Sequence, residues 1–195
     1  MKKQLIGLGV AALIFGGVVS AGATPILETN AGKLIGASGV EVNGALYNVS
    51  FVEGSCVDLY GGCVENSYFT FQTQSLAIQA SQALLDQVFI DVYDQYPDLT
   101  YGIENEWKGM IFTPWQVQPP SGVALAFAIN YSTASGTADS TTLGGTGSAI
   151  STTDFDLFTY AQWESAAPVP EPATMLLFGT GLIGLVGSRL RKKKK

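Results

Sequence analysis

Two uncharged apolar segments, one near each end of the chain, confine any globular domain to the residues between them. The first covers residues 5–19 and follows Lys2 and Lys3, and the second covers residues 173–188 and precedes a basic terminus. Segments of this kind enter membranes or the export machinery, so they are not expected to contribute to a water-soluble core. The stretch between them, residues 24–167, is long enough for one extracytoplasmic globular domain of ordinary size.

The N-terminal segment has the order of parts of a secretory signal peptide. Two lysines precede a short apolar run, and the small residues Ala21-Gly22-Ala23 follow it. They fit the small-x-small rule of signal peptidase, so cleavage is expected after Ala23, with Ala21 as the alternative. Residues 1–23 would then be removed and the mature chain would begin at Thr24. An uncleaved anchor is the other interpretation, but the run is short and rich in glycine.

Charge is distributed as unevenly as hydrophobicity. Lys33 and Lys108 are the only basic residues in the middle of the chain, whereas every carboxylate except Glu171 lies there. Binding to nucleic-acid phosphates needs lysine and arginine, so nucleic acid is excluded as a partner. The chain has no histidine, which removes the commonest general base and zinc ligand and any Ser-His-Asp triad. We therefore assign no catalytic residue, cofactor or metal site.

The only two cysteines lie close together in SCVDLYGGCVEN. In an exported protein such a pair is expected to form a disulfide, here between Cys56 and Cys63. Closing so short a loop should stabilise the fold by roughly 2.5 kcal/mol on the chain-entropy estimate. A two-thiol metal site without histidine and a redox pair wider than C-x-x-C are the less favoured alternatives.

The C-terminal segment predicts a membrane helix over residues 173–188. Such a helix spans roughly 24 Å at about 1.5 Å per residue, which is short of the ~30 Å hydrocarbon core. The basic residues after it extend its reach by snorkelling and keep that end cytoplasmic. An ordinary C-terminal membrane anchor would have the same composition.

The residues around this helix are more specific than the helix itself. Val169-Pro170-Glu171-Pro172 precedes the apolar run, and Arg189 and Arg191 follow it. The two prolines prevent a helix across the motif and keep it extended. Motif, apolar run and basic cluster together, residues 168–195, closely resemble the PEP-CTERM sorting signal. The terminal lysines depart from the arginines more usual in that family, but they keep the charge.

This resemblance implies that signal peptidase and exosortase process the protein in a Gram-negative bacterium that makes exopolysaccharide. The tail would hold the protein transiently in the inner membrane, with its basic end cytoplasmic. After cleavage near the motif, the protein would reach the cell surface or the extracellular matrix. If the motif is not read, the same segment acts only as a membrane anchor.

The middle of the chain predicts an α+β domain. GVEVNGALYNVSFVEG alternates around Asn43-Gly44, a strong hairpin signal. A helix is expected from Ser75 as N-cap, and strands are expected at 68–73, 109–114, 123–131 and 154–163. Residues 132–153 are rich in serine, threonine and glycine and are expected to form a flexible loop that joins the last two strands as a hairpin. We therefore expect an antiparallel sheet with one main helix packed on it.

Candidate functional side chains are carboxylates and aromatic rings. The carboxylates at positions 91, 94, 98, 104 and 106 could support glycoside hydrolysis. Those at 154 and 156, and the cluster at 91–98, could bind calcium. A solvated acidic face explains all of these groups better. Tyr101, Trp107, Trp115 and Tyr131 could stack on sugar rings or fill the core. Trp107 is expected to be exposed, because it lies between Glu106 and Lys108. The preferred hypothesis is a non-catalytic surface or matrix protein associated with exopolysaccharide or biofilm. The alternative is an exported carboxylate-dependent glycoside hydrolase.

Overall fold

The computed structural model describes residues 24–166. The predicted signal peptide, residues 1–23, and the sorting segment, residues 168–195, lie outside the described residues. Within the described part, no helix is long and apolar enough to cross a bilayer.

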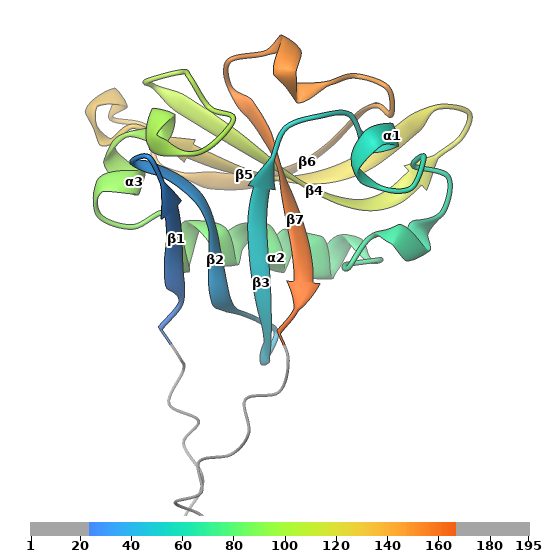
Figure 1. Ribbon diagram of the computed structural model, residues 1–195, viewed down its shortest axis with the longest axis horizontal. Coiled ribbons are helices and arrows are strands. Elements are labelled where there is room, and N and C mark those ends of the chain that lie inside the picture. Colours follow the sequence, from blue (N-terminus) through green and yellow to red (C-terminus); the bar gives the residue numbers. More distant parts are fainter. Residues whose placement is uncertain (1–23, 167–195) are drawn as a thin grey trace, which may run out of the picture.

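Seven strands form one strongly twisted sheet with the order β1-β2-β3-β7-β4-β5-β6. In Figure 1, β1, β2, β3 and β7 run vertically and β4, β5 and β6 cross behind them. The N-terminal end of β1 and the C-terminal end of β7 lie at the same side of the domain. The strands are β1 (Ile26–Asn30), β2 (Lys33–Val42), β3 (Ala45–Val52), β4 (Lys108–Gln118), β5 (Gly122–Tyr131), β6 (Ser140–Gly147) and β7 (Phe158–Ser165).

The sheet is mixed rather than purely antiparallel, and this corrects the predicted fold in part. The last strand, β7, lies in the middle of the sheet, antiparallel to β3 and parallel to β4. The expected hairpin between the strands at 123–131 and 154–163 is therefore wrong, because β5 pairs with β4 and β6 instead. The last strand therefore joins two antiparallel groups of strands, β1-β2-β3 and β4-β5-β6, into one sheet.

The turn between β2 and β3 confirms the predicted hairpin. Asn43 and Gly44 both have positive φ, of 51° and 79°, and Val42 pairs with Ala45 across the two-residue turn. Positive φ at both central positions is what a type I′ turn requires and what asparagine and glycine tolerate. The expected apolar side of the hairpin is largely buried, except for Ala45, which is exposed.

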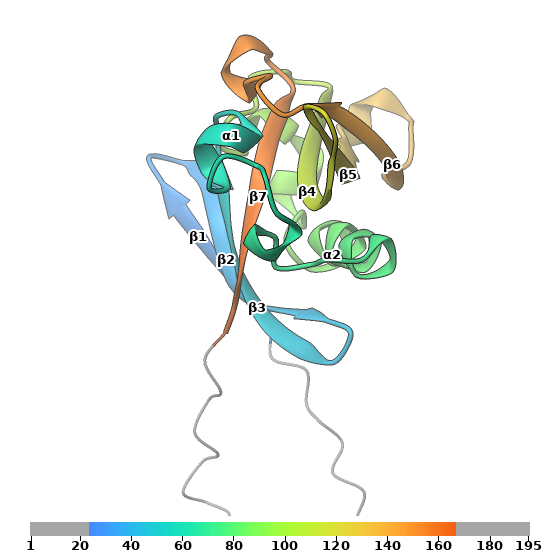
Figure 2. The same ribbon diagram turned by 90° about the vertical axis from the view of Figure 1, so that its right-hand side faces the viewer.

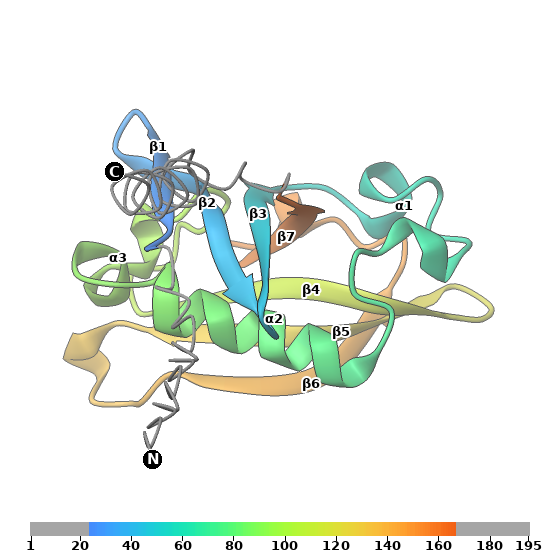
Figure 3. The same ribbon diagram turned by 90° about the horizontal axis from the view of Figure 1, so that it is seen from below.

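The main helix, α2 (Gln74–Gln87), lies in the angle between the two halves of the sheet, as Figures 2 and 3 show. It begins one residue before the predicted N-cap, because the Thr73 side chain accepts a hydrogen bond from Leu76 N–H at 3.3 Å. Its buried face is made mainly of small residues, and it meets the alanines of β5. Small side chains on both elements let the helix approach the sheet closely.

Both faces of the sheet are covered, so the domain has two apolar clusters. The main core lies between the sheet and α2 and includes Phe51, Phe89 and Trp163. The second core lies on the other face, beneath α1 (Cys56–Leu59), which Figure 2 shows opposite α2. The predicted disulfide is present there, because Cys56 and Cys63 are bonded and both are buried.

Two predicted segments have other conformations. Residues 132–153, expected to be a flexible loop, contain strand β6, which extends the sheet by pairing with β5 along its length. Residues 68–73, expected to be a strand, follow the 3₁₀ turn Asn66–Tyr68 and cross from one face of the sheet to the other. Phe69 is buried in the second core and Phe71 in the main core. The apolar pattern there reflects this crossing rather than a strand.

Candidate functional site

An open hollow of about 330 Å³ lies where β4 begins. Three separate segments form it: the turn after α3 (Val92–Gln95), the loop before β4, and the residues just after β5. We call it the Trp107 hollow, and it is lined by Tyr96, Asp98, Glu106, Trp107, Ser132 and Ala134.

Hydrogen bonds from side chains and backbone to the main chain hold these segments together. Ser132 donates from its N–H to the carbonyl of Trp107 at 2.9 Å and from its hydroxyl to the carbonyl of Gln95 at 2.9 Å. The Asn105 side chain accepts from the Trp107 N–H at 3.1 Å and fixes the loop before β4. Asn130, at the end of β5, donates to the carbonyl of Tyr93 at 2.8 Å. The main chain of the hollow is therefore well supported, while the side chains of Tyr96, Glu106 and Trp107 are exposed.

Two large aromatic side chains of the hollow are exposed. Trp107 is 58% exposed and Tyr96 is 52% exposed. Aromatic side chains of this size stabilise a protein most when they are buried in its core, and these two contribute little of that stabilisation. Asp98 and Glu106 add carboxylate oxygens, which accept hydrogen bonds from hydroxyl groups. Rings that can stack on a sugar and carboxylates that can accept from its hydroxyls are thus brought together.

The other aromatic candidates lie elsewhere. Trp115 packs half-buried against the main core, toward the opposite end of β4 from Trp107, so it lies apart from the Trp107 hollow. The ring of Tyr131 lies beneath the Lys108 ammonium, 5.5 Å from its centroid. Tyr101 is 42% exposed but lines a different hollow.

That second hollow is acidic and measures about 380 Å³. It is lined by Tyr101 and by the carboxylates of Glu53, Glu104, Asp154 and Asp156. Of the carboxylates considered for calcium, it therefore holds those at 154 and 156 but none of the cluster at 91–98. Nevertheless, no group of three or more carboxylates or cysteines in residues 24–166 is placed to hold a metal ion.

The carboxylates at positions 91–106, which were predicted as a cluster, lie in several different places. One of them, Asp94, lies near a carboxylate outside the predicted cluster. Asp94 interacts with Asp139, which lies just before β6. Burial raises the pKa of Asp139, and the charge of Asp94 and a hydrogen bond to Asp94 raise it further. The N–H of Tyr131, which donates to Asp139 at 2.7 Å, acts in the opposite direction. No sequence motif marks Asp139, because the pairing of β6 with β5 brings it to Asp94.

Comparison with known proteins identifies one part of the chain. Residues 168–192 match a family model described as the PEP-CTERM protein-sorting motif, as the resemblance predicted. The match contains all the predicted sorting residues, namely Val169, Pro170, Glu171, Pro172, Arg189 and Arg191, which lie outside the described residues. No curated protein and no solved structure matches the chain. The motif indicates an exported protein sorted by exosortase, and it leaves the activity of residues 24–166 unassigned.

Proposed function

The chain carries a PEP-CTERM sorting motif, and from that premise we propose that it is a non-catalytic surface or matrix protein that binds exopolysaccharide at the Trp107 hollow. The observation that carries this proposal is the exposure of Trp107 and Tyr96 in one supported hollow. In this proposal, exosortase delivers the domain to the polymer that the hollow binds.

The chemistry of the hollow fits a sugar ring. One face of a pyranose presents C–H groups that pack on an aromatic ring, and its hydroxyl groups donate to carboxylates. Asp98 and Glu106 provide such acceptors beside Trp107. Because the aromatic rings are already exposed, binding a sugar buries apolar surface without unfolding any part of the domain.

The acidic charge of the domain bears on whether the polysaccharide that it binds is charged or neutral. Lys33 and Lys108 are its only basic residues among many carboxylates, and Lys33 donates to the carbonyls of Asp98 and Ile103. An acidic polysaccharide would be repelled. We therefore propose a neutral polysaccharide as the ligand.

A binding assay tests the proposal. The exopolysaccharide of the source organism is titrated into the full chain in nanodiscs, and tryptophan fluorescence and co-sedimentation are recorded. Trp107→Ala should weaken binding at least about fivefold, since stacking of one ring on an aromatic side chain is worth about 1–3 kcal/mol. Tyr101→Ala is the matched control, because Tyr101 is an exposed aromatic residue of the acidic hollow, and it should leave binding unchanged. Equal binding by both variants, or no binding by the parent protein, would contradict the proposal.

A second candidate function is supported by one observation, because two carboxylates, Asp98 and Glu106, line the same hollow as the aromatic rings. Paired carboxylates are the usual machinery of glycoside hydrolysis. New reducing ends, measured after long incubation with the polymer, would reveal cleavage. If the protein is a hydrolase, Asp98→Asn or Glu106→Gln should abolish the release of new reducing ends. If it is only a binding protein, the parent protein releases none.

A further inference from the structure

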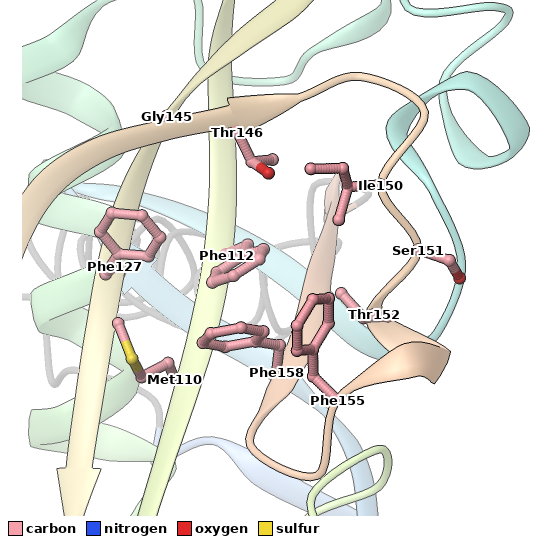
Figure 4. Close-up of a pocket in the computed structure, with 10 residues that line it drawn as sticks. All are labelled: Met110, Phe112, Phe127, Gly145, Thr146, Ile150, Ser151, Thr152, Phe155 and Phe158. Atoms are coloured by element: carbon pink, nitrogen blue, oxygen red, sulfur yellow. The ribbon is translucent and has the colours of Figure 1, made fainter.

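A second surface feature, independent of the Trp107 hollow, is an aromatic pocket on the face of the sheet opposite α2. Figure 4 shows phenylalanine side chains from β4, β5, β7 and the loop before β7 arranged around it. Its volume is about 190 Å³. We call it the phenylalanine pocket, and its main walls are Met110, Phe112, Phe127, Ile150, Phe155 and Phe158.

The pocket is built from rings that support one another. Phe112 lies 5.0 Å from Phe127 and 5.0 Å from Phe158, between ring centroids, and Phe158 lies 5.2 Å from Phe155. Because these are edge-to-face or tilted contacts, the rings hold each other in place. The base is rigid, since Phe112 lies on a central strand and is 6% exposed.

One glycine of β6 keeps this arrangement possible. A Cβ at Gly144 would lie 2.2 Å from the ring of Phe127, so only glycine allows that ring to lie against the strand. The next residue, Gly145, lines the pocket with its backbone. Gly144 therefore leaves the space that the Phe127 ring occupies in the wall of the pocket.

The pocket carries no charge, although the domain is strongly acidic. None of its lining residues is charged. Two of its hydroxyl groups already have partners. The Thr152 hydroxyl donates to the Gly54 carbonyl at 3.3 Å, and the Ser151 hydroxyl is hydrogen-bonded to the Thr153 hydroxyl at 2.7 Å. The Thr146 side chain points toward the pocket in Figure 4. A charged ligand would lose its hydration without gaining a partner.

The rim of the pocket exposes apolar surface that a ligand would cover. Phe155 is 44% exposed and Ile150 is 48% exposed. The volume exceeds the ~150 Å³ of an engineered apolar cavity that binds benzene. A ring-sized molecule therefore fits between the fixed base and the rim.

We propose that the phenylalanine pocket is a binding site for a neutral, ring-sized apolar molecule, aromatic or alicyclic. The ligand would lie against Phe112 and Phe158 and beneath the rim formed by Ile150 and Phe155. Any hydroxyl group on it would bond to Thr146. This site is separate from the proposed glycan site, and its existence does not depend on glycan binding.

Methionine NMR provides a direct test, because Met110 lines the pocket. The full chain in nanodiscs is labelled with ¹³C at the methionine methyl groups, and the Met110 signal is assigned with Met110→Leu. Met175 lies in the predicted membrane segment, so its signal reports ligand that has only dissolved in lipid. The probes are benzyl alcohol, benzylammonium and benzoate, which share one ring but differ in charge, together with glucose.

Benzyl alcohol should shift the Met110 signal upfield in a saturable manner, with a Kd of about 1 mM or lower. The two charged probes should bind at least tenfold more weakly, and glucose should have no effect. Phe155→Ala should weaken binding at least fivefold, and Ile150→Trp should abolish it by filling the pocket. Leu143→Ala is the control, because Leu143 is also exposed on β6 but does not line the pocket.

Several results would overturn the proposal. They are the absence of a saturable Met110 shift, equal shifts with benzoate and benzyl alcohol, a shift with glucose, and a shift confined to Met175. A response of Leu143→Ala as large as that of Phe155→Ala would also overturn it, because binding would then not be located in the pocket. Failure of glycan binding at Trp107 would leave all these expectations unchanged.

Discussion

Opening the disulfide should destabilise the domain by an amount that can be calculated in advance. Cys56 and Cys63 are separated by 7 positions, and a loop of that length is worth about 2.5 kcal/mol on the chain-entropy estimate. Reducing the bond should therefore lower the free energy of unfolding by about 2.5 kcal/mol. With a urea slope of about 1.5 kcal/mol per M, the midpoint should fall by about 1.7 M.

A double variant separates the cross-link from packing. Both cysteines are buried in the second core, with exposures of 0% and 4%. Cys56→Ala with Cys63→Ala loses the cross-link and two buried methylene-sized groups, so it should lose about 4 kcal/mol. The difference between the reduced protein and the double variant then measures the packing of the sulfur atoms.

The assay is urea unfolding followed by tryptophan fluorescence, because Trp163 is buried in the main core. The parent protein is measured with and without reductant, and the double variant must not respond to reductant. If the reduced and oxidised parent proteins unfold at the same urea concentration, the loop does not restrict the unfolded chain and the estimate is wrong. If the reduced protein unfolds only around the second core, in a separate early transition, the two cores are not one cooperative unit.

Three further predictions address the carboxylate pair, a close strand contact and the sorting motif. Because the native state raises the pKa of Asp139, the stability contribution of that proton is present at acidic pH and is lost as pH rises through the native pKa. Asp139→Asn should thus stabilise the domain by about 0.5 kcal/mol at pH 7. There should be no gain below the unfolded pKa, and thermal unfolding across pH measures both. Gly36→Ala should cost about 1–3 kcal/mol, because a Cβ there would lie 2.3 Å from the Val49 carbonyl oxygen; an unchanged melting temperature would contradict this. Changing residues 170–172 to alanine should leave export intact but block processing, and immunoblots of both membranes and the medium should show the full-length precursor in the inner membrane; equal processing of both forms would exclude recognition of the motif.

The sequence predicted correctly those elements whose conformation depends on neighbouring residues in the chain. Asn43-Gly44 determines the β2–β3 turn, and helical spacing marks α2. The pattern in β5 was harder to interpret, because Val123 and Leu125 belong to the second core while the alanines at 126 and 128 belong to the main core beneath α2. Both faces of this strand are buried. The alternation of large and small side chains therefore reflects two different cores, one on each face, rather than one buried and one exposed face.

Elements that depend on distant pairing could not be predicted. The sequence of β6 has few apolar residues, and the strand is held by backbone hydrogen bonds to β5. The position of β7 between β3 and β4 depends on contacts far apart in the chain. The same applies to the candidate site: Trp107 was predicted from its charged neighbours, but Tyr96 and Ser132 reach it through separate segments.

The central position of β7 determines how the domain would bear mechanical load. Its paired residues Met110 and Phe158 place the start of β7 near the start of β4, and therefore near the Trp107 hollow, whereas its other end leads directly to the C-terminal segment. A polymer pulling on the hollow and a tail held at the cell envelope would thus pull along β7 in opposite directions. The hydrogen bonds to β3 and β4 lie across that direction, so they would be sheared together rather than opened one at a time.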